Sequence, residues 1–404
     1  MKVVVQKFGG TSVRNEEVRR QAAHHVKEAV ENGYKVIVVV SAMGRKGDPY
    51  ATDTLLSLVN GNDSFADVRE KDLLVSCGEV ISSVVFTDLL QSLNVKASAV
   101  TGAQAGFRTN EEFSNAKIID MQCDGLKERL HHFDVVVVAG FQGSSATGEI
   151  TTLGRGGSDT SATALGAALQ AEYVDIFTDV EGVMTADPRM VDTARPLKAV
   201  TYNEICNMAY QGAKVIHPRA VEIAMQAKIP IRIRSTQSDG AGTLITTTHG
   251  GSAGSDLEER PVTGIAHLSE ISQITVKEKE GQYNLQADVF KTMAQANISV
   301  DFINIHPTGV VYTVPDHLAA KAEQLLLDKG YESQVVRNCS KVSAVGAGMT
   351  GVPGVASKIV AALTEQNIQI LQSADSHTTI WVLVHGEDTK KAVNALHHMF
   401  ELEN

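Results

Sequence analysis

The chain opens with a strand-like run that ends in a lysine and two glycines, ahead of a stretch typical of a helix. Lys7 stands just before Gly9 and Gly10 in the segment KFGGTS. Glycines at such a turn let backbone N–H groups approach a phosphate, and a lysine beside them can neutralise a transferring phosphoryl group. The segment is therefore a candidate phosphate cradle. A glycine pair is also a common structural turn, and neither a GxxxxGK[ST] nor a GxGxxG pattern accompanies it.

A second glycine loop, GRGGSDTS at residues 154–161, leads into a helix of small residues. The structural explanation is a helix cap, because Ser158 or Asp159 would satisfy the free N–H groups at the start of the helix. A cap does not require Arg155, however. A guanidinium held between glycines beside a helix N-terminus matches the paired oxygens of a carboxylate or a phosphate. We therefore predict an anion-binding point at Arg155.

Three further polar clusters lie in the same part of the chain: SCGE at 76–79, FTDVEGVMTADPR at 177–189 and GAKVIHP at 212–218. Each cluster taken singly is more typical of a turn or a helix cap than of a site, and their occurrence together favours a site. We interpret His217, next to Pro218, as structural. The paired histidines elsewhere lack cysteines or carboxylates at ligand spacing, so we predict no metal site formed by protein ligands alone.

The elements that must position these residues are parallel strands and helices. Continuous β-branched runs at 36–40 and 135–138 suit strands that are buried on both faces of a sheet. We predict a helix over 16–31 and one α/β domain over 1–247. The next segment, 248–261, is rich in Gly, Ser, Thr and Asp and is predicted to be a linker.

An internal repeat follows the linker. An offset of 70 residues aligns 289–300 with 359–370, and 310–314 with 380–384, without a gap. The first copy, 269–338, has a βαββαβ order. The second copy, 339–404, lacks its fourth strand, and the run at 262–268 is the obvious donor. We therefore predict that the first copy is inserted in the second.

Composition excludes several classes of function. The 404 residues carry a net charge of −11, which argues against nucleic acid or an anionic membrane as the main partner. No apolar run approaches the roughly 20 residues of a membrane-spanning helix, and the N-terminus has no targeting signal. The 4 cysteines are single and far apart, so a reducing, cytoplasmic location is expected.

Taken together and in order, KFGGTS, SCGE, GRGGSDTSA, FTDVEGVMTADPR and GAKVIHPRA resemble the amino-acid kinase fold and, within it, the aspartokinases. The C-terminal repeat resembles the paired ACT domains of that family. The resemblance is greatest to the short, monofunctional bacterial type that senses diaminopimelate. It implies an α/β amino-acid kinase domain with a mainly parallel sheet between helices, followed by two ferredoxin-like βαββαβ ACT domains.

The resemblance implies an activity and the residues that carry it. The reaction would be ATP plus L-aspartate to 4-phospho-L-aspartate plus ADP, the first step towards lysine, diaminopimelate, methionine and threonine, with feedback through the ACT domains. The implied catalytic residues are Lys7, Asp159 and Lys214, with Asp159 orienting both lysines. The implied ATP-binding residues are Lys7, Phe8, Gly9, Gly10, Thr11, Ser41, Thr178, Asp179, Met184, Asp187 and Arg189. Met184 departs from an aromatic residue found in some relatives.

For the amino acid, the resemblance implies a second set of residues. They are Thr52, Asp53, Glu79, Arg155, Gly156, Gly157 and Ser158. Glu79 would face the α-ammonium group and Arg155 a carboxylate, and this pair of fixed charges would discriminate against neutral amino acids. A side-chain carboxylate is already ionised at neutral pH and needs no general base. Mg-ATP would be the co-substrate, and no tightly bound prosthetic group is expected.

Regulation and partners follow from the same resemblance. The effector-binding residues it suggests are Gly281, Gln282, Asp301, Gly351 and Asp375, although loops that merely close a βα unit explain them equally well. The effector would be diaminopimelate, or alternatively lysine or threonine. No methionine lies between Met225 and Met293 to start a separate small subunit, so a homodimer through the ACT domains is expected.

Two alternatives remain open at this point. The first is another amino-acid kinase, acting on glutamate, N-acetylglutamate or a nucleoside monophosphate; Glu79, the GRGGSD loop and the ACT pair disfavour it. The second is an amino-acid sensor without catalysis, which would lack Lys7, Asp159 or Lys214. All three are present.

Overall fold

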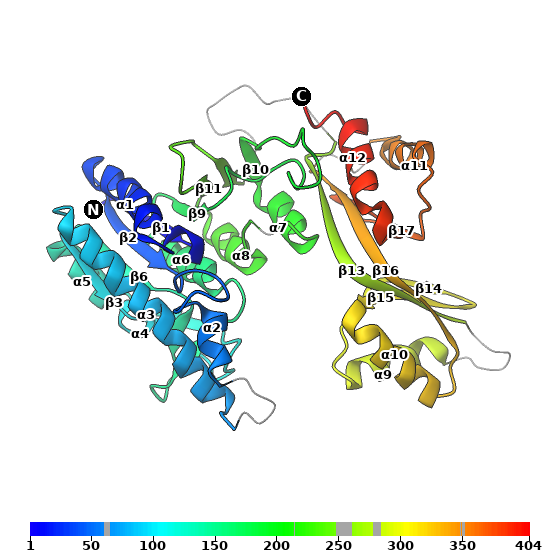
Figure 1. Ribbon diagram of the computed structural model, residues 1–404, viewed down its shortest axis with the longest axis horizontal. Helices are drawn as coiled ribbons and strands as arrows, with labels where there is room; N and C mark the ends of the chain where they lie inside the picture. The colour runs from blue at the N-terminus through cyan, green and yellow to red at the C-terminus, as the bar shows by residue number, and fades with distance from the viewer. Residues whose placement is uncertain (60–64, 214, 248–260, 278–283, 348, 350–351) are drawn as a thin grey trace. The chain divides into compact units, whose positions relative to one another are not determined.

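The chain divides into two compact units (Figure 1). The computed structural model describes residues 1–59, 65–213, 215–247, 261–277, 284–347, 349 and 352–404. The first unit comprises the described residues of Met1–Val183, Pro196–Ala209 and Lys214–Leu257, and the second those of Met184–Arg195, Tyr210–Ala213 and Glu258–Asn404. Except for residue 261, the predicted linker lies outside the described residues. The predicted domain boundaries remain a prediction.

An eight-stranded sheet forms the centre of the first unit, in the order β10-β12-β11-β9-β1-β2-β6-β3. All neighbours in this sheet are parallel except β11 and β12. The strands are β1 (Val3–Phe8), β2 (Lys35–Val40), β3 (Ala97–Val100), β6 (Val135–Ala139), β9 (Val174–Thr178), β10 (Ala199–Thr201), β11 (Ile231–Ser235) and β12 (Thr243–Thr246). The predicted parallel α/β architecture is confirmed.

A smaller sheet and a set of α-helices complete the described part of this unit. The sheet has the order β5-β4-β7-β8 and consists of β4 (Phe107–Thr109), β5 (Ile118–Met121), β7 (Gln142–Ser144) and β8 (Ile150–Thr152). The helices are α1 (Glu16–Glu31), α2 (Thr52–Ser57), α3 (Val68–Ser92), α4 (Gly102–Ala105), α5 (Asp124–His132), α6 (Gly157–Leu169), α7 (Tyr202–Tyr210) and α8 (Pro218–Ala227), with a 3-10 turn at Gly10–Ser12.

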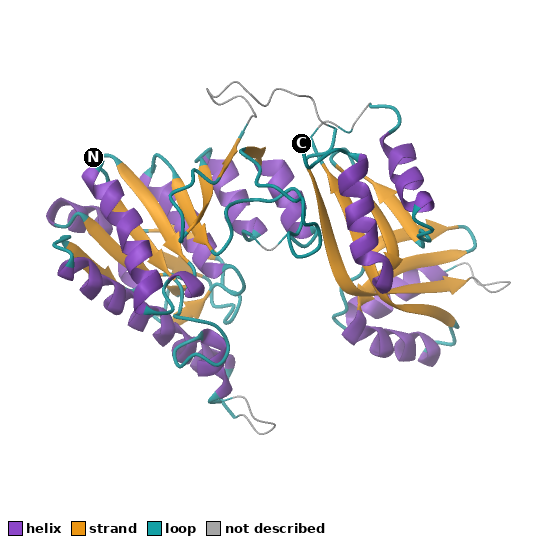
Figure 2. Ribbon diagram, turned by 45° about the horizontal axis from the view of Figure 1, so that its top comes forward, coloured by secondary structure: helices purple, strands orange, loops and turns teal. Residues whose placement is uncertain are grey.

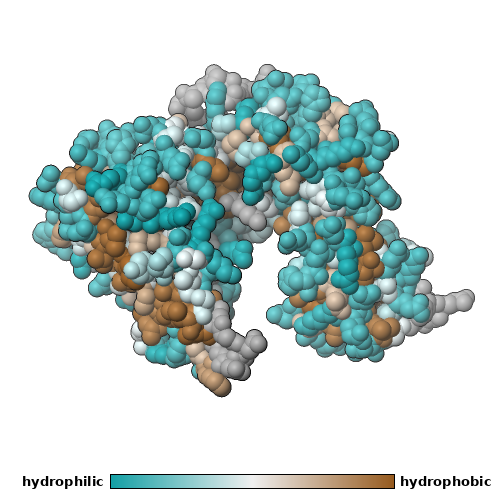
Figure 3. All heavy atoms as spheres, viewed as in Figure 1, coloured by the Kyte–Doolittle hydropathy of each residue, from teal (hydrophilic) through white to brown (hydrophobic). Residues whose placement is uncertain are grey.

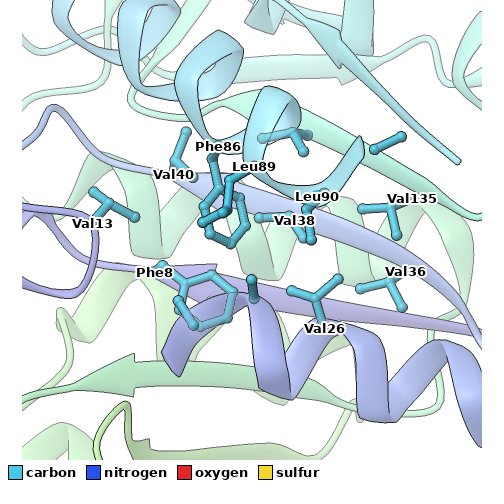
Figure 4. Packing of buried hydrophobic residues seen from close by; sticks show 14 of the residues in the cluster. Phe8, Val13, Val26, Val36, Val38, Val40, Phe86, Leu89, Leu90 and Val135 are labelled. Carbon is cyan, nitrogen blue, oxygen red and sulfur yellow. The ribbon is translucent and has the colours of Figure 1, made fainter. Parts of the chain in front are cut away.

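One hydrophobic core of this unit lies between the large sheet and helices α1 and α3. Figure 4 shows Phe8 and Val38 from neighbouring strands packed with Val26 of α1 and Phe86 of α3. The alternate residues of the same strands, such as Ile37, are equally buried. Helices therefore cover both faces of the sheet, as the unbroken β-branched runs predict.

Helix α3 is apolar enough to need separate comment. By length and composition alone it could cross a membrane, but half of its most apolar window is buried inside the protein. Its buried residues include the carboxylates Asp72 and Glu79, and Phe86 belongs to the core. Hydrophobic residues gather over this helix on the face shown in Figure 3. Val68 and Val84 of the same helix are exposed. The helix is best understood as a core helix with one apolar outer face.

The second unit is built on one six-stranded sheet in the order β14-β15-β13-β16-β18-β17 (Figure 2). Its strands are β13 (Gly264–Lys277), β14 (Asp301–His306), β15 (Gly309–Pro315), β16 (Ser333–Val345), β17 (Gln372–Asp375) and β18 (Thr379–His385). Its helices are α9 (Leu285–Gln295), α10 (Asp316–Asp328), α11 (Val355–Glu365) and α12 (Thr389–Met399), with a 3-10 turn at Gly386–Asp388.

Strands β13 and β16 each serve both copies of the repeat. The first part of β13, from Gly264 to Leu268, pairs with the last part of β16, whereas residues 273–276 pair with 333–336. The 264–268 segment thus supplies the fourth strand that the second copy lacks. The predicted insertion of the first copy in the second is confirmed.

The two copies keep the same local contacts at the offset of 70 residues. Helices α9 and α11 begin and end 70 positions apart, as do strands β15 and β18. Lys321 donates to the carbonyl of Ala296 at 3.2 Å, and Lys391 donates to the carbonyl of Gln366 at 2.6 Å. In each copy, a lysine of the second helix thus satisfies a carbonyl at the end of the first.

Residues 184–195 pack into the core of the second unit, which the sequence did not predict. Ala186 and Val191 join the same apolar cluster as residues of α11 and α12. The Thr185 hydroxyl lies 2.9 Å from Nε2 of His397, which is 1% exposed. Arg195 donates to the carbonyl of Leu402 at 3.1 Å. His397 is therefore a buried contact residue between α12 and the 184–195 segment.

Substitution in α11 tests this packing. Leu363→Ala should lower the free energy of unfolding by about 2–5 kcal/mol, because it removes fully buried methyl groups and leaves a cavity. Val360, on the same helix, is 50% exposed. Val360→Ala should change the free energy by no more than about 0.5 kcal/mol. Urea unfolding of the full chain, followed by circular dichroism, measures both; equal effects would contradict the burial of Leu363.

Candidate active site

The carboxyl ends of the parallel strands border a cavity of about 290 Å³ in the first unit. Strand β1 leads into Gly9, β2 leads into the loop that contains Gly44, and β9 ends at Thr178. Parallel α/β sheets bind ligands at this edge, beyond the carboxyl ends of their strands. The cavity is lined by Lys7, Gly9, Gly10, Thr11, Gly44, Arg45, Asp159, Ile176, Phe177, Thr178, Asp179 and Val215.

An ion pair between Lys7 and Asp159 lies in the cavity wall. The Nζ of Lys7 is 2.7 Å from Oδ1 of Asp159, and both side chains are 13% exposed. The second oxygen of Asp159 accepts a hydrogen bond from the backbone N–H of His217 at 3.3 Å. The carboxylate therefore holds the lysine from one side and the start of α8 from the other. Lys214, the other predicted catalytic lysine, lies outside the described residues.

The glycines after β1 allow close backbone contact with the next loop. The N–H of Gly44 donates to the carbonyl of Gly10 at 2.9 Å. A Cβ on Gly10 would lie 2.6 Å from the carbonyl oxygen of Gly44 and 2.7 Å from that of Ala42. Only glycine fits this position. The 3-10 turn at Gly10–Ser12 therefore packs closely on the loop after β2, and its residues Gly10 and Thr11 line the cavity.

Arg45 is a charged residue of the cavity lining that was not predicted from the sequence. Its guanidinium donates to Asp179 at 2.8 Å, so the loop after β2 and the end of β9 are joined across the cavity. The segment GRKG at 44–47 offered a signal, because it places two cations between glycines directly after a buried strand. Four further lining residues were also missed: Gly44, Ile176, Phe177 and Val215.

Glu79 is the most perturbed carboxylate near this edge of the sheet. The side chain is 2% exposed, and its Oε1 accepts a hydrogen bond from the N–H of Ala42 at 3.0 Å. Its Oε2 is buried and has no hydrogen-bond partner among the described residues. Burial raises the pKa of Glu79 to about 8. A buried carboxylate with one unpaired oxygen is a natural partner for a ligand cation.

The second glycine loop presents Arg155 to solvent. Gly154 and Gly156 both have positive φ angles, +73° and +69°. A Cβ on Gly156 would lie 2.3 Å from the Cβ of His217, so the loop packs tightly on that histidine. The guanidinium of Arg155 is exposed and makes no hydrogen bond or ion pair within the described part of the chain. It is available to an anionic ligand.

His217 has a structural contact at the start of α8. Its Nδ1 accepts a hydrogen bond from the N–H of Arg219 at 3.3 Å and so caps the helix. Burial lowers the pKa of the His217 imidazole. This is the structural role expected from its place next to Pro218.

The other predicted ligand residues lie in several elements of the first unit and differ in burial. Thr52 and Asp53 form the first turn of α2, and Gly157 and Ser158 are buried at the start of α6. The N–H of Ser41 donates to the carbonyl of Phe8 at 3.1 Å. The Phe8 side chain is fully buried and stacks on Phe177, with ring centroids 4.7 Å apart, so it does not line the cavity.

Three residues predicted to bind nucleotide lie in the second unit: Met184, Asp187 and Arg189. The guanidinium of Arg189 is bound by Asp187, with the shortest contact at 2.6 Å. Hydrogen bonding to Arg189 lowers the pKa of Asp187. The resemblance implied that these residues bind ATP, and this stays a prediction.

Two of the predicted effector residues can be described. Asp301 forms an ion pair with the buried side chain of Lys341 at 2.5 Å. Asp375 is exposed at the end of β17. Gly281, Gln282 and Gly351 lie outside the described residues. In the described ranges, no group of three or more His, Cys, Asp or Glu side chains is placed to hold a metal ion.

Comparison with known proteins agrees with this arrangement. Residues 2–235 match the amino acid kinase family, and residues 334–398 match an ACT domain. The chain is 64% identical to Aspartokinase 1 of Bacillus subtilis (strain 168) over 402 residues, which cover 100% of both chains. It is 39% identical to Aspartokinase 2 of the same organism over 412 residues, covering 100% of this chain and 98% of that one.

A solved structure is similar over nearly the whole chain. E. coli aspartokinase III in complex with aspartate and ADP is 26% identical, with a TM-score of 0.78, over 98% of this chain and 99% of that one. The fold and the site thus define an amino acid kinase with C-terminal ACT domains. Within that class, the chain belongs to the aspartokinase family.

The close contact at Gly10 gives a test of the cavity. Gly10→Ala should displace the loop after β2 and weaken ATP binding at least about tenfold, because its Cβ would meet backbone atoms that cannot move aside alone. Gly125, at an exposed position on α5, has no atom within 4 Å of an added Cβ. Gly125→Ala should leave ATP binding unchanged and raise stability by about 0.5–1 kcal/mol. Calorimetric titration measures the affinity; unchanged ATP binding by Gly10→Ala would contradict the assignment.

Proposed function

We propose that this chain transfers the γ-phosphoryl group of ATP to the side-chain carboxylate of L-aspartate, using the cavity at the carboxyl edge of β1, β2 and β9. The chain is an aspartate kinase, and it produces 4-phospho-L-aspartate and ADP. The observation that carries the mechanism is the Lys7–Asp159 ion pair. It holds the lysine ammonium beside Gly9 and Gly10 in the cavity wall.

On the nucleotide side, Lys7 and the N–H groups of Gly9 to Thr11 would surround the phosphates. Asp159 holds the lysine ammonium in one place, so its charge can act where negative charge develops in the transition state. Arg45 adds a second cation in the cavity wall. Thr178 and Asp179, at the end of β9, would contact the nucleoside end of ATP. The second predicted lysine, Lys214, would act beside Lys7.

On the amino-acid side, Glu79 and Arg155 provide opposite charges. The unpaired Oε2 of Glu79 would accept the α-ammonium group, and Arg155 would bind a carboxylate. Thr52, Asp53 and Ser158 would supply smaller hydrogen bonds. An amino acid with a second carboxylate satisfies this arrangement, whereas a neutral amino acid leaves a charged group without a partner.

No general base is needed for the transfer. The aspartate side chain has a pKa near 4, so it is ionised at neutral pH and can attack the γ-phosphorus directly. One oxygen of the carboxylate forms the new P–O bond as the bond to the ADP oxygen breaks. The protein therefore contributes position and charge stabilisation, mainly through Lys7 and the backbone N–H groups of the turn.

A Mg²⁺ ion would arrive with ATP and be held chiefly by the phosphates. Mg²⁺ commonly uses substrate phosphates with one or two carboxylates. Both oxygens of Asp159 already have protein partners, so the phosphates of ATP would supply most of the ligands of the ion. When bound, it would neutralise charge on the transferring group.

The ACT domains are proposed to bind a feedback amino acid. Diaminopimelate is the expected effector, with lysine or threonine as alternatives, and Asp301 and Asp375 are proposed contacts. E. coli aspartokinase III, in complex with lysine and aspartate, is 27% identical to this chain, with a TM-score of 0.77, over 98% of this chain and 99% of that one. We further propose a homodimer through the ACT domains and a cytoplasmic location.

Trapping of the product tests the function. With Mg-ATP and hydroxylamine, aspartate should yield the hydroxamate of an acyl phosphate, and glutamate and N-acetylglutamate should yield little. Lys7→Ala should lower kcat by about 10³-fold or more, because the lysine acts in the transition state. Its folded structure, checked by circular dichroism, should persist. Absence of hydroxamate from aspartate would refute the proposal.

The raised pKa of Glu79 predicts how aspartate use depends on pH. Below pH 8 the free protein holds Glu79 mostly protonated, and this neutral form cannot bind the ammonium group. The kcat/KM for aspartate should therefore rise about tenfold per pH unit between pH 6 and 7 and level off above about pH 9. Steady-state kinetics at saturating Mg-ATP measures the profile.

Glu79→Gln provides the control for this profile. The variant should lose most of its affinity for aspartate and also lose the rise in kcat/KM near pH 8.

The same variant has an expected effect on stability. Because the Glu79 carboxyl has a folded pKa above its unfolded value, its contribution to stability falls as pH rises from about 4.5 to about 8. Glu79→Gln should therefore melt at a higher temperature than the parent at pH 8.5. A parental pH profile in this variant would assign the titration to another group.

A further inference from the structure

Asp72, on helix α3, is a buried carboxylate that no proposed catalytic step uses. It is 1% exposed, and it accepts hydrogen bonds from two distant segments. The N–H of Thr152 donates to Oδ2 at 2.7 Å, and the Thr152 hydroxyl donates to Oδ1 at 2.8 Å. The N–H of Ser114 donates at 2.9 Å, and its hydroxyl at 3.2 Å. All these donors belong to backbone or hydroxyl groups, and within the described residues Asp72 forms no ion pair.

Arg219 holds the same two segments from α8. Its guanidinium donates to the carbonyl of Leu153 at 3.2 Å and to the carbonyl of Ala116 at 3.1 Å. The two segments also bond directly, because the N–H of Ala116 donates to the carbonyl of Thr152 at 2.8 Å. A carboxylate and a guanidinium thus fix consecutive residues, 152 and 153, immediately before the second glycine loop.

The segment at 114–115 also contacts the glycine loop itself. A Cβ on Gly154 would lie 2.9 Å from Oδ1 of Asn115 and 3.0 Å from the carbonyl oxygen of Ser114. Ser114 has a φ of +67°, a conformation uncommon for a residue with a side chain, and its bonds to Asp72 stabilise it there. The path of the backbone into Gly154 is therefore set by the residues that Asp72 binds.

We propose that Asp72 and Arg219 are positioning residues that hold the 152–154 backbone so that Arg155 meets the carboxylate of the amino-acid substrate. This inference rests on the proposed role of Arg155. Arg155 is exposed and has no partner of its own within the described chain, so its position depends on the backbone that carries it. A buried carboxylate satisfied only by N–H and O–H donors orients those donors strongly, since a neutral amide would turn one N–H group against them.

The test compares the KM for aspartate with the KM for ATP in the same variant. Asp72→Asn should raise the KM for aspartate by about 10- to 100-fold, because a displacement of about 1 Å in a binding group has effects of this size. The KM for ATP should stay within about twofold, since Asp72 does not line the nucleotide cavity. Asp88→Asn, the same chemical change at an exposed position on α3, should leave both constants unchanged. Asp72→Glu, which keeps the charge, should recover part of the loss.

A milder variant guards against loss of folding. Thr152→Val removes one hydroxyl donor to Asp72 with little change of shape, and it should raise the KM for aspartate about 3- to 10-fold. A parental KM for aspartate in both Asp72→Asn and Thr152→Val would overturn the inference, as would equal increases in the KM values for aspartate and ATP.

Arg155→Ala separates this inference from the proposed function. If it raises the KM for aspartate at least 100-fold while Asp72→Asn does not, Arg155 keeps its role and the positioning role of Asp72 is wrong. If Arg155→Ala leaves the KM unchanged, the proposed binding role of Arg155 and the inference built on it both fall. Phosphorylation of aspartate by the parent protein is the reference for every comparison.

Discussion

The ion pair between Lys7 and Asp159 is the interaction on which the site depends. It joins the end of β1 to the first turn of α6, two elements far apart in the chain, inside a largely buried wall. Removing one partner of a buried pair leaves an uncompensated charge, which costs about 3–5 kcal/mol. The positions of Lys7 and of the first turn of α6 are therefore coupled, and Asp159 extends that coupling to α8 through the N–H of His217.

Around this closed pair, two ionisable side chains, Glu79 and Arg155, keep polar atoms without a partner among the described residues. Glu79 keeps one buried oxygen without a hydrogen bond among the described residues, at a cost in solvation that a bound ammonium group would offset. Arg155 extends from the second glycine loop, and Asp72 and Arg219 bind the residues just before that loop. The same loop packs against His217, whose backbone meets Asp159. The proposed amino-acid site and the proposed phosphate site thus share one support, although they use different side chains.

The sequence predicted the elements and several of the residues that line the cavity, because both leave local signals. β-Branched runs mark buried strands, the repeat offset counts the strands of each ACT copy, and glycine turns mark Lys7 and Arg155. Other features depend on contacts between distant segments. No local signal marks Asp72 among the polar residues of α3, because its role depends on contacts with Ser114 and Thr152. Likewise, Val191 is apolar and is expected to be buried, but the local sequence does not indicate which of the cores it joins.

The strands shared by the two ACT copies limit how this part of the protein can be divided. A gene fragment for residues 269–338 would end inside both long strands and strip 264–268 from the second copy. Each remnant would then present an unpaired strand edge, which invites aggregation. Exchange of regulatory modules between relatives, in evolution or by engineering, must therefore move the pair as a whole.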